Sequence, residues 1–144
     1  MDRPFTIRDL GEVAIRCCDL AAMTAFYRDL LGLEVIDGDY PETAVRLCIG
    51  TGHGGEARHL TLFVDDDGDG GEAEDDPPCH HLVLTVSVAD LPVAAAWFRA
   101  RGLAVEQAER PSLGWKSLYL RNPEGNTVEL VAATRQHTPE AGAD

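Results

Sequence analysis

The sequence has no uninterrupted run of about 18 apolar residues and no basic, apolar leader at its N-terminus. Neither export nor membrane insertion is therefore indicated, and we expect a cytoplasmic protein. Basic side chains are also few, because 12 lysines and arginines stand against 25 aspartates and glutamates, which gives a net charge of -13. This charge repels phosphate groups, so we expect a small-molecule partner and neither a nucleic acid nor a membrane.

Cysteine is scarce as well. The four cysteines (Cys17, Cys18, Cys48 and Cys79) show no C-x-x-C spacing. Cys17 and Cys18 are neighbours in a predicted strand, where adjacent side chains point to opposite faces. We therefore expect free, mostly buried thiols. What the chain does have is 144 residues with 44% hydrophobic side chains, enough to bury the core of one domain or of two small halves that share it.

The first half predicts the order β-α-β-β-β. Residues 10–17 alternate between apolar and polar side chains, as expected of a strand with one buried face. A helix over 20–31 follows, because Asp19 is a good N-cap, the apolar residues have helical spacing, and Gly32 suits a helix end. Three further strands are predicted at 33–36, 44–49 and 59–64.

The segment 65–78 separates this first module, residues 1–64, from the rest. It holds eight acidic residues and two prolines, which is too charged to pack, so we predict a flexible linker. Part of it imitates a calcium-binding loop that starts at Asp65. The twelfth position is Asp76 rather than glutamate, and no flanking helices are evident, which argues against a calcium site.

The second module, residues 79–133, repeats the order of the first. A strand is predicted at 81–86, and a helix runs from an N-cap at Asp90 to about residue 101. The later predicted strands are 103–106, 115–120 and 126–132, and the turn before the last of them is Asn122-Pro-Glu-Gly-Asn126. The tail, residues 134–144, has no periodicity and is expected to be disordered.

The two halves superpose with an offset close to 70 residues. This offset pairs Glu12 with His81 on the first strands and His59 with Glu129 on the last strands. Each pair joins a carboxylate to an imidazole. If a pseudo-two-fold axis relates the halves, all four side chains could converge on it, and two nitrogen and two oxygen ligands suit Zn, Ni, Co, Mn or Fe(II). His80 could replace His81 only if the strand register slips by one residue.

Four stretches carry a resemblance to a known family: Val13-Ala-Ile-Arg-Cys-Cys-Asp-Leu20 leading into Phe26-Tyr-Arg-Asp-Leu-Leu-Gly-Leu33, then His80-His-Leu-Val-Leu84, and Asn122-Pro-Glu-Gly-Asn-Thr-Val-Glu-Leu130. With them the chain resembles the vicinal oxygen chelate superfamily, in particular its glyoxalase I-like members. The resemblance implies an α+β fold of two tandem βαβββ modules that form a cup-shaped sheet, with a divalent metal held on the first and last strands of each module.

In this chain those strand positions correspond to Glu12, His59, His81 and Glu129. The order departs from the glyoxalase I pattern, which usually has His or Gln where Glu12 stands and Glu where His59 stands. A metal that holds two adjacent substrate oxygens could stabilise an enediolate while Glu129, our candidate base, and Glu12 move a proton. This chemistry indicates a lyase, isomerase or epimerase.

Two alternatives belong to other classes. A metal-free protein would use the same cup to sequester an antibiotic or aromatic compound. A dioxygenase would use His59, His81 and Glu129 as a facial triad on Fe(II).

Three further residues are candidates for substrate binding. Arg16 shares the face of Glu12 and could hold an anionic substrate or pair with Glu12. Trp115 and Tyr119 could line the cavity or belong to the core. Each module would expose a concave face, and the resemblance implies sites formed between chains, so we expect a homodimer in which Glu12 and His59 of one chain face His81 and Glu129 of the other.

Overall fold

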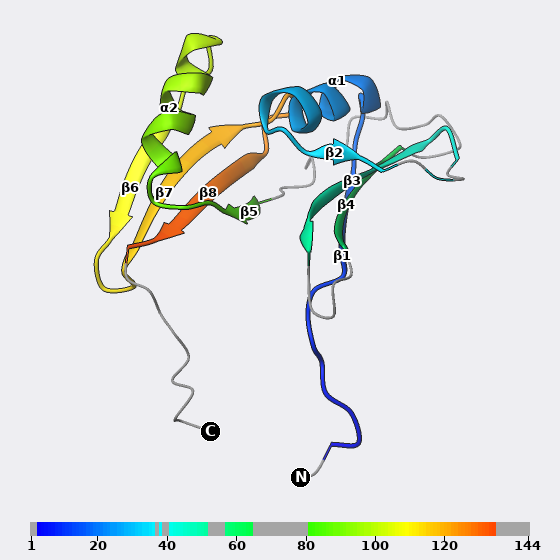
Figure 1. Ribbon diagram of the computed structural model, residues 1–144. Helices are drawn as coiled ribbons and strands as arrows, with labels where there is room; N and C mark the ends of the chain where they lie inside the picture. The colour runs from blue at the N-terminus through cyan, green and yellow to red at the C-terminus, as the bar shows by residue number, and fades with distance from the viewer. Residues whose placement is uncertain (1–2, 37, 39–40, 52–56, 65–80, 135–144) are drawn as a thin grey trace, which may run out of the picture. The chain divides into compact units, whose positions relative to one another are not determined.

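The computed structural model describes residues 3–36, 38, 41–51, 57–64 and 81–134. The predicted linker and all of the predicted tail except Thr134 lie outside the described residues, so both stay predictions. The chain divides into two compact units, Met1–Pro77 and Pro78–Asp144, and each is described by itself. Figure 1 labels the elements of both units.

The first unit is a four-stranded mixed sheet with one helical segment. Its strands have the order β1-β4-β3-β2; β1 runs parallel to β4, and the other neighbours are antiparallel. The helix α1 continues without a break into a π-helical turn, η1, which the sequence did not predict. The elements are β1 (Glu12–Arg16), α1 (Leu20–Ala25), η1 (Phe26–Leu30), β2 (Glu34–Val35), β3 (Ala44–Thr51) and β4 (Ala57–Phe63).

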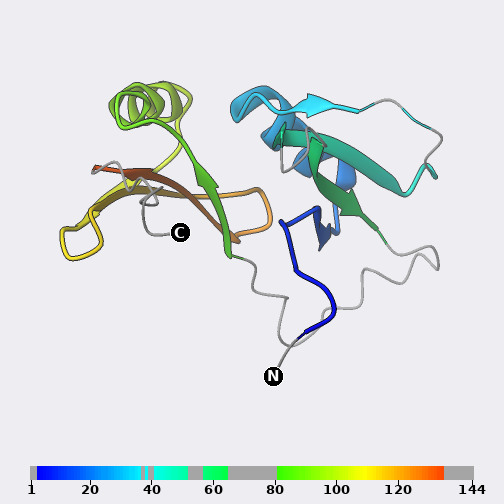
Figure 2. The ribbon, with the colours of Figure 1, turned by 60° about the horizontal axis from the view of Figure 1, so that its bottom comes forward.

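The helical segment begins and ends where the sequence predicts. The carboxylate of Asp19 accepts a hydrogen bond from the backbone N–H of Ala22 at 3.0 Å, which caps the first turn. Gly32 adopts a φ of 79°, a left-handed conformation that favours glycine after a helix. Between these two points the segment covers one face of the sheet (Figure 2). Its apolar side chains bury the strand residues beneath them, and the core includes Met23, Phe26, Tyr27, Ile15, Cys17, Leu47, Leu60 and Leu62.

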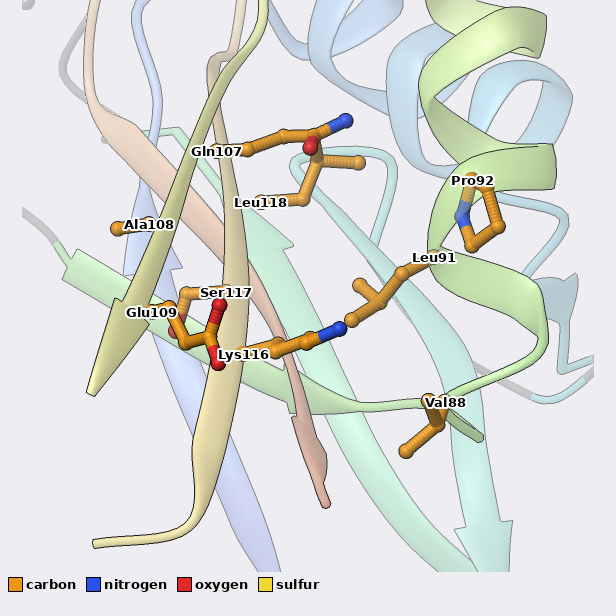
Figure 3. A pocket seen from close by; sticks show the side chains of 9 residues that line it. All are labelled: Val88, Leu91, Pro92, Gln107, Ala108, Glu109, Lys116, Ser117 and Leu118. Atoms are coloured by element: carbon orange, nitrogen blue, oxygen red, sulfur yellow. The ribbon is translucent and has the colours of Figure 1, made fainter. Parts of the chain in front are cut away.

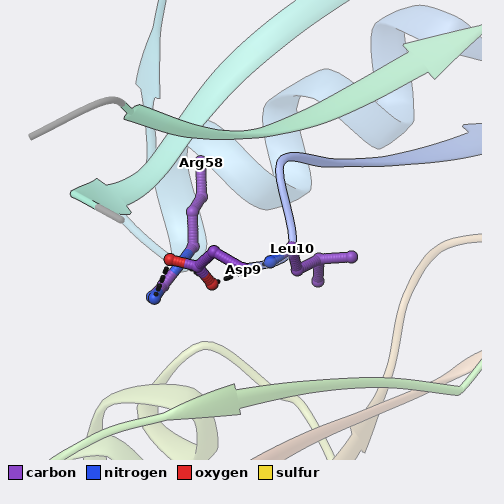
Figure 4. A network of polar contacts seen from close by, with 3 residues as sticks. All are labelled: Asp9, Leu10 and Arg58. Carbon is purple, nitrogen blue, oxygen red and sulfur yellow. Dashed lines mark hydrogen bonds and ion pairs between the residues drawn. The ribbon is translucent and has the colours of Figure 1, made fainter. Parts of the chain in front are cut away.

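An ion pair fixes the approach to β1. The guanidinium of Arg58 on β4 donates to both carboxylate oxygens of Asp9, with Nε–Oδ1 at 3.2 Å and Nη2–Oδ2 at 2.8 Å (Figure 4). The same carboxylate accepts the backbone N–H of Leu10 at 2.7 Å. Because these bonds hold the chain just before β1, they help to set the position of Glu12, the first residue of that strand.

The second unit repeats the architecture, with the strand order β5-β8-β7-β6 and one helix. Again the first and last strands, β5 and β8, run parallel, and the other neighbours are antiparallel. The fold class predicted from the sequence is therefore confirmed in each unit. The elements are β5 (His81–Thr85), α2 (Asp90–Ala100), β6 (Glu106–Arg110), β7 (Trp115–Arg121) and β8 (Thr127–Ala133).

Two predicted boundaries of the second unit are wrong. Asp90 is the first helical residue rather than the N-cap, because its N–H bonds to the carbonyl of Ser87, and the cap residue Ala89 has no side-chain hydrogen bond. The strand predicted at 103–106 begins instead at Glu106. The backbone N–H of Leu103 bonds to the carbonyl of Phe98 at 3.0 Å, which keeps this residue in the turn that ends the helix.

The turn before β8 has the predicted chemistry. Asn122 is buried, and its side-chain oxygen accepts the backbone N–H groups of Glu124 and Asn126 at 3.0 and 3.1 Å. Gly125 adopts a φ of 84°, which a side chain would strain. Val128 and Leu130 of β8 then face the core, so strand alternation turns Glu129 to the opposite face.

Candidate functional site

Glu129 lies on the face of the second sheet that is turned away from Val128, Leu130 and the core, which we call the outer face. One carboxylate oxygen, Oε1, is 2.9 Å from Nε2 of His81 on the neighbouring strand β5. The side chain of Glu129 is only 8% exposed, whereas that of His81 is 54% exposed. The pair therefore joins a nearly buried carboxylate to an imidazole that solvent or a ligand can reach.

Ser117 on β7 holds the other oxygen of the same carboxylate. Its hydroxyl donates to Oε2 of Glu129 at 2.6 Å, and Ser117 is itself buried. This short bond to a charged acceptor fixes the orientation of the carboxylate. Sequence reasoning missed Ser117, although strand alternation between the two aromatic candidates on β7 would have placed it on their face.

Those aromatic candidates, Trp115 and Tyr119, lie on the outer face with Glu129, as the cross-strand register shows. Tyr119 is the register partner of Glu129, its ring centroid lies 6.5 Å from that of His81, and its hydroxyl accepts a hydrogen bond from Arg110 at 3.3 Å. Trp115 is 42% exposed, so it is not a core residue. Tyr119 also lines a cavity of about 310 Å³ together with Glu106, Arg121 and Thr127. Their role toward a substrate stays a prediction.

The corresponding face of the first unit carries Glu12. Its Oε2 accepts a hydrogen bond from the hydroxyl of Thr61 on β4 and lies 3.3 Å from Nε of Arg46 on β3. The arginine that pairs with Glu12 is thus one that sequence reasoning did not single out, and Arg16 is not that partner. Arg16 is exposed at the end of β1 on the same face, as alternation predicts.

The strand registers correct the predicted equivalence of His59 and Glu129. In the first unit the strand register places Glu12 opposite His59, but in the second unit it places His81 opposite Thr127. The residue of the first unit that matches Glu129 is therefore Thr61, because the last strands are related by an offset of 68 rather than 70 residues. A shift by two keeps every side chain on its face, so the sequence pattern contains no trace of it.

The distances test whether a metal fits these residues. Donors at about 2.1 Å from one ion and at right angles to each other lie about 3 Å apart, which matches His81 Nε2 and Glu129 Oε1. Across the part of the chain that the structure describes, no three His, Cys, Asp or Glu side chains gather closely enough to hold an ion. The second unit therefore offers two well-placed donors, whereas the first offers Glu12 in an ion pair with Arg46.

No helix among the described residues is both long and apolar enough to cross a membrane. Two units with the order βαβββ, each with a mixed sheet whose outer face carries the candidate residues, define a paired-module α+β fold.

Residues 9–130 match the family model of the Glyoxalase/Bleomycin resistance protein/Dioxygenase superfamily, and the chain belongs to this superfamily. A comparison with curated proteins gives no match. Among solved structures, the chain is similar to a lactoylglutathione lyase from Agrobacterium tumefaciens, with 26% identity, a TM-score of 0.67, and coverage of 94% of this chain and 100% of that one.

Two other solved structures share the fold. An integron cassette protein from the mobile metagenome of a sewage outfall at Halifax Harbour is 21% identical, with a TM-score of 0.70 and coverage of 88% of this chain and 99% of that one. The oxidase ChaP-H2 is 20% identical, with a TM-score of 0.64 and coverage of 89% and 94%. At these identities the likeness shows the fold alone.

Proposed function

We propose that the chain is a metal-dependent enzyme that transfers a proton on a small substrate, as a lyase, isomerase or epimerase. The observation that carries this proposal is the contact between His81 and Glu129, two metal-capable side chains whose donor atoms lie 2.9 Å apart, with the imidazole of His81 exposed. The likeness to a protein named lactoylglutathione lyase supports the class of reaction.

In this proposal His81, Glu129 and Glu12 hold the ion, and His59, the fourth donor predicted from the sequence, contributes least. When bound, the metal polarises two adjacent oxygens of the substrate. Glu129 is the base. Because Oε1 faces His81 and the ion, the proton is taken up at Oε2, beside the Ser117 hydroxyl, and Glu12 is the second carboxylate available to return it.

The first unit favours a second candidate function. Glu12 already has a cationic partner, because Arg46 lies 3.3 Å from it, and this ion pair competes with metal ligation. A protein that binds a planar or anionic compound without a metal would keep that pair intact. Its signature is stoichiometric binding without turnover, whereas a dioxygenase would consume oxygen.

The experiment is a metal analysis of the full chain purified without a His-tag, followed by calorimetric titration with Zn²⁺, Ni²⁺, Co²⁺ and Mn²⁺. The proposal expects one ion per chain and an affinity about 100-fold lower in Glu129→Gln, because a ligand is lost without a change of shape. Glu34→Gln, which removes an exposed carboxylate from the edge strand β2, is the matched control. If the wild-type chain binds no ion but binds a small aromatic compound, the enzyme proposal is wrong and the metal-free binding protein is favoured.

We also propose a homodimer whose metal sites are shared between chains. A Glu12→Ala chain and a Glu129→Ala chain each carry a defect in both sites of their own homodimer. Their heterodimer concentrates both defects in one site and leaves the other intact. Metal binding should therefore return in part when the two chains are refolded together, and a mixture without any recovery refutes shared sites.

A further inference from the structure

A second cavity of about 410 Å³ lies in the second unit, between the first turn of α2 and the strands β6 and β7 (Figure 3). Its size is near the lower end of small-molecule sites, which span about 300–1,000 Å³. Apolar side chains form its walls, and polar side chains of the two strands line the rest. The lining includes Leu91, Pro92, Leu118, Gln107, Glu109 and Lys116.

This cavity is separate from the His81–Glu129 pair. Lys116 and Leu118 alternate along β7 with Ser117, which also lines the cavity but whose hydroxyl bonds to Glu129 on the outer face. Because side chains alternate across a strand, Lys116 and Leu118 point to the helix side. A ligand of this cavity would therefore lie behind β7, with the sheet between it and the proposed metal site.

The cavity exists because the helix does not cover the edge of the sheet. α2 packs against β7 and β8, with Leu91, Ala95 and Phe98 buried. All five residues of β6 are exposed, so the space beside this strand is open to solvent. Leu91 and Leu118 form the apolar wall from the helix and the sheet, and Gln107 closes one end, as Figure 3 shows.

A carboxylate and an ammonium group lie at the other end of the cavity. Glu109 and Lys116 are register partners on β6 and β7, and both line the cavity. Yet among the contacts of the described residues no ion pair joins these two side chains, although cross-strand neighbours of opposite charge commonly pair. An anionic and a cationic group are thus both presented beside an apolar wall.

We propose that this cavity binds an α-amino acid with an apolar side chain. Its carboxylate would pair with the ammonium of Lys116, its ammonium with the carboxylate of Glu109, and its side chain would lie between Leu91 and Leu118. A zwitterion satisfies both charges at once, which neither a simple carboxylate nor a simple amine does. The wall sets the preference for an aliphatic or aromatic side chain.

The test is a calorimetric titration of the full chain with L-leucine and L-phenylalanine. Two analogues of leucine separate the charges: 4-methylpentanoate lacks the ammonium and 3-methylbutylamine lacks the carboxylate. We expect saturable binding of the amino acids and binding at least about tenfold weaker for either analogue, since each leaves one charged partner unmatched. Equal binding of an analogue and the amino acid overturns the proposal.

Two variants locate the site. Lys116→Met and Glu109→Gln should each weaken binding of L-leucine about tenfold, because each removes one charge at an exposed position without removing bulk. The matched controls are Arg99→Met on the exposed side of α2 and Glu106→Gln on the opposite face of β6, and both should bind as the wild type does. Binding of L-leucine that is unchanged in Lys116→Met and Glu109→Gln overturns the assignment, as does an equal loss in the two controls.

The proposal stands apart from the metal-dependent function. Glu129→Gln should keep the affinity for L-leucine unchanged although it lowers the metal affinity, because the residue lies on the other face of the sheet. Absence of leucine binding in the wild type overturns the cavity proposal and leaves the metal proposal as it was.

Discussion

The two units place different chemistry on equivalent backbones. In the second unit, His81 on the first strand contacts the carboxylate of Glu129, which lies on the last strand two residues beyond Thr127, the register partner of His81. In the first unit the equivalent residue, Glu12, meets the hydroxyl of Thr61 and the guanidinium of Arg46. One unit therefore presents two metal-capable side chains side by side, and the other presents a single carboxylate that forms an ion pair with Arg46. Two units with the same strand order can therefore contribute unequally to a binding site, because the side chains at equivalent positions differ.

The largest expected effect comes from breaking the second unit's pair. His81→Ala should lower metal affinity about 100-fold, because a ligand of the better-formed half is lost. Glu12→Ala should lower it less, since Arg46 competes with the metal for that carboxylate. Calorimetric titration of both variants with Zn²⁺ measures the difference. A larger loss in Glu12→Ala than in His81→Ala contradicts the ranking of the two units.

The hydroxyls that hold the two carboxylates give a matched comparison. Ser117→Ala should weaken metal binding about tenfold, because the bond that orients Glu129 is removed. Thr61→Val removes the hydroxyl beside Glu12 at nearly constant volume and should have a smaller effect. The readouts are zinc affinity and the thermal midpoint without metal, which separates a loss of orientation from a loss of stability. Equal affinities for Ser117→Ala and the wild type would show that the bond positions nothing.

The register shift predicts a modest role for His59. This residue is equivalent to Thr127 rather than to Glu129, so His59→Ala should change metal affinity by less than about threefold. Thr127→Ala serves as the control in the second unit. If His59→Ala lowers the metal affinity as much as His81→Ala does, His59 is a metal ligand, as the 70-residue repeat predicts.

The smallest effect is expected at an exposed ion pair in the first unit. The hydrogen bond from Arg28 lowers the pKa of the Asp29 carboxyl. A lowered folded-state pKa stabilises the fold above the unfolded pKa, and this contribution is lost as pH falls through the folded value. Asp29→Asn should therefore flatten the acid limb of the thermal midpoint slightly, because the pair is fully exposed and screened by solvent. A large change at neutral pH would contradict this.

Local signals in the sequence predicted much of the fold. Asp19 and Gly32 bound the first helical segment because capping and left-handed backbone depend on single residue types. Alternation likewise placed Glu12 and Glu129 on the outer faces of their sheets. The turn at Asn122 sets the start of β8 through its own side chain. Each of these features is decided within a few residues of the chain.

The rest depends on contacts between strands, which no local pattern encodes. The two-residue shift that brings Thr61, rather than His59, into the position of Glu129 leaves the alternation unchanged. Ser117 and Arg46 are ordinary residues on their own strands and gain significance only from the carboxylates of neighbouring strands. The late start of β6 follows from the hydrogen bond of Leu103 to the end of α2.

The claim that the second unit carries the dominant metal donors can be tested most directly by following the imidazole ring signals in NMR spectra during a zinc titration. His81→Ala and His59→Ala spectra assign the two rings. The account predicts that the His81 signals shift and saturate at one equivalent of Zn²⁺, and that this shift persists in His59→Ala. If the His81 signals remain at their metal-free positions while zinc binds, the pair is not a metal site and the claim is contradicted.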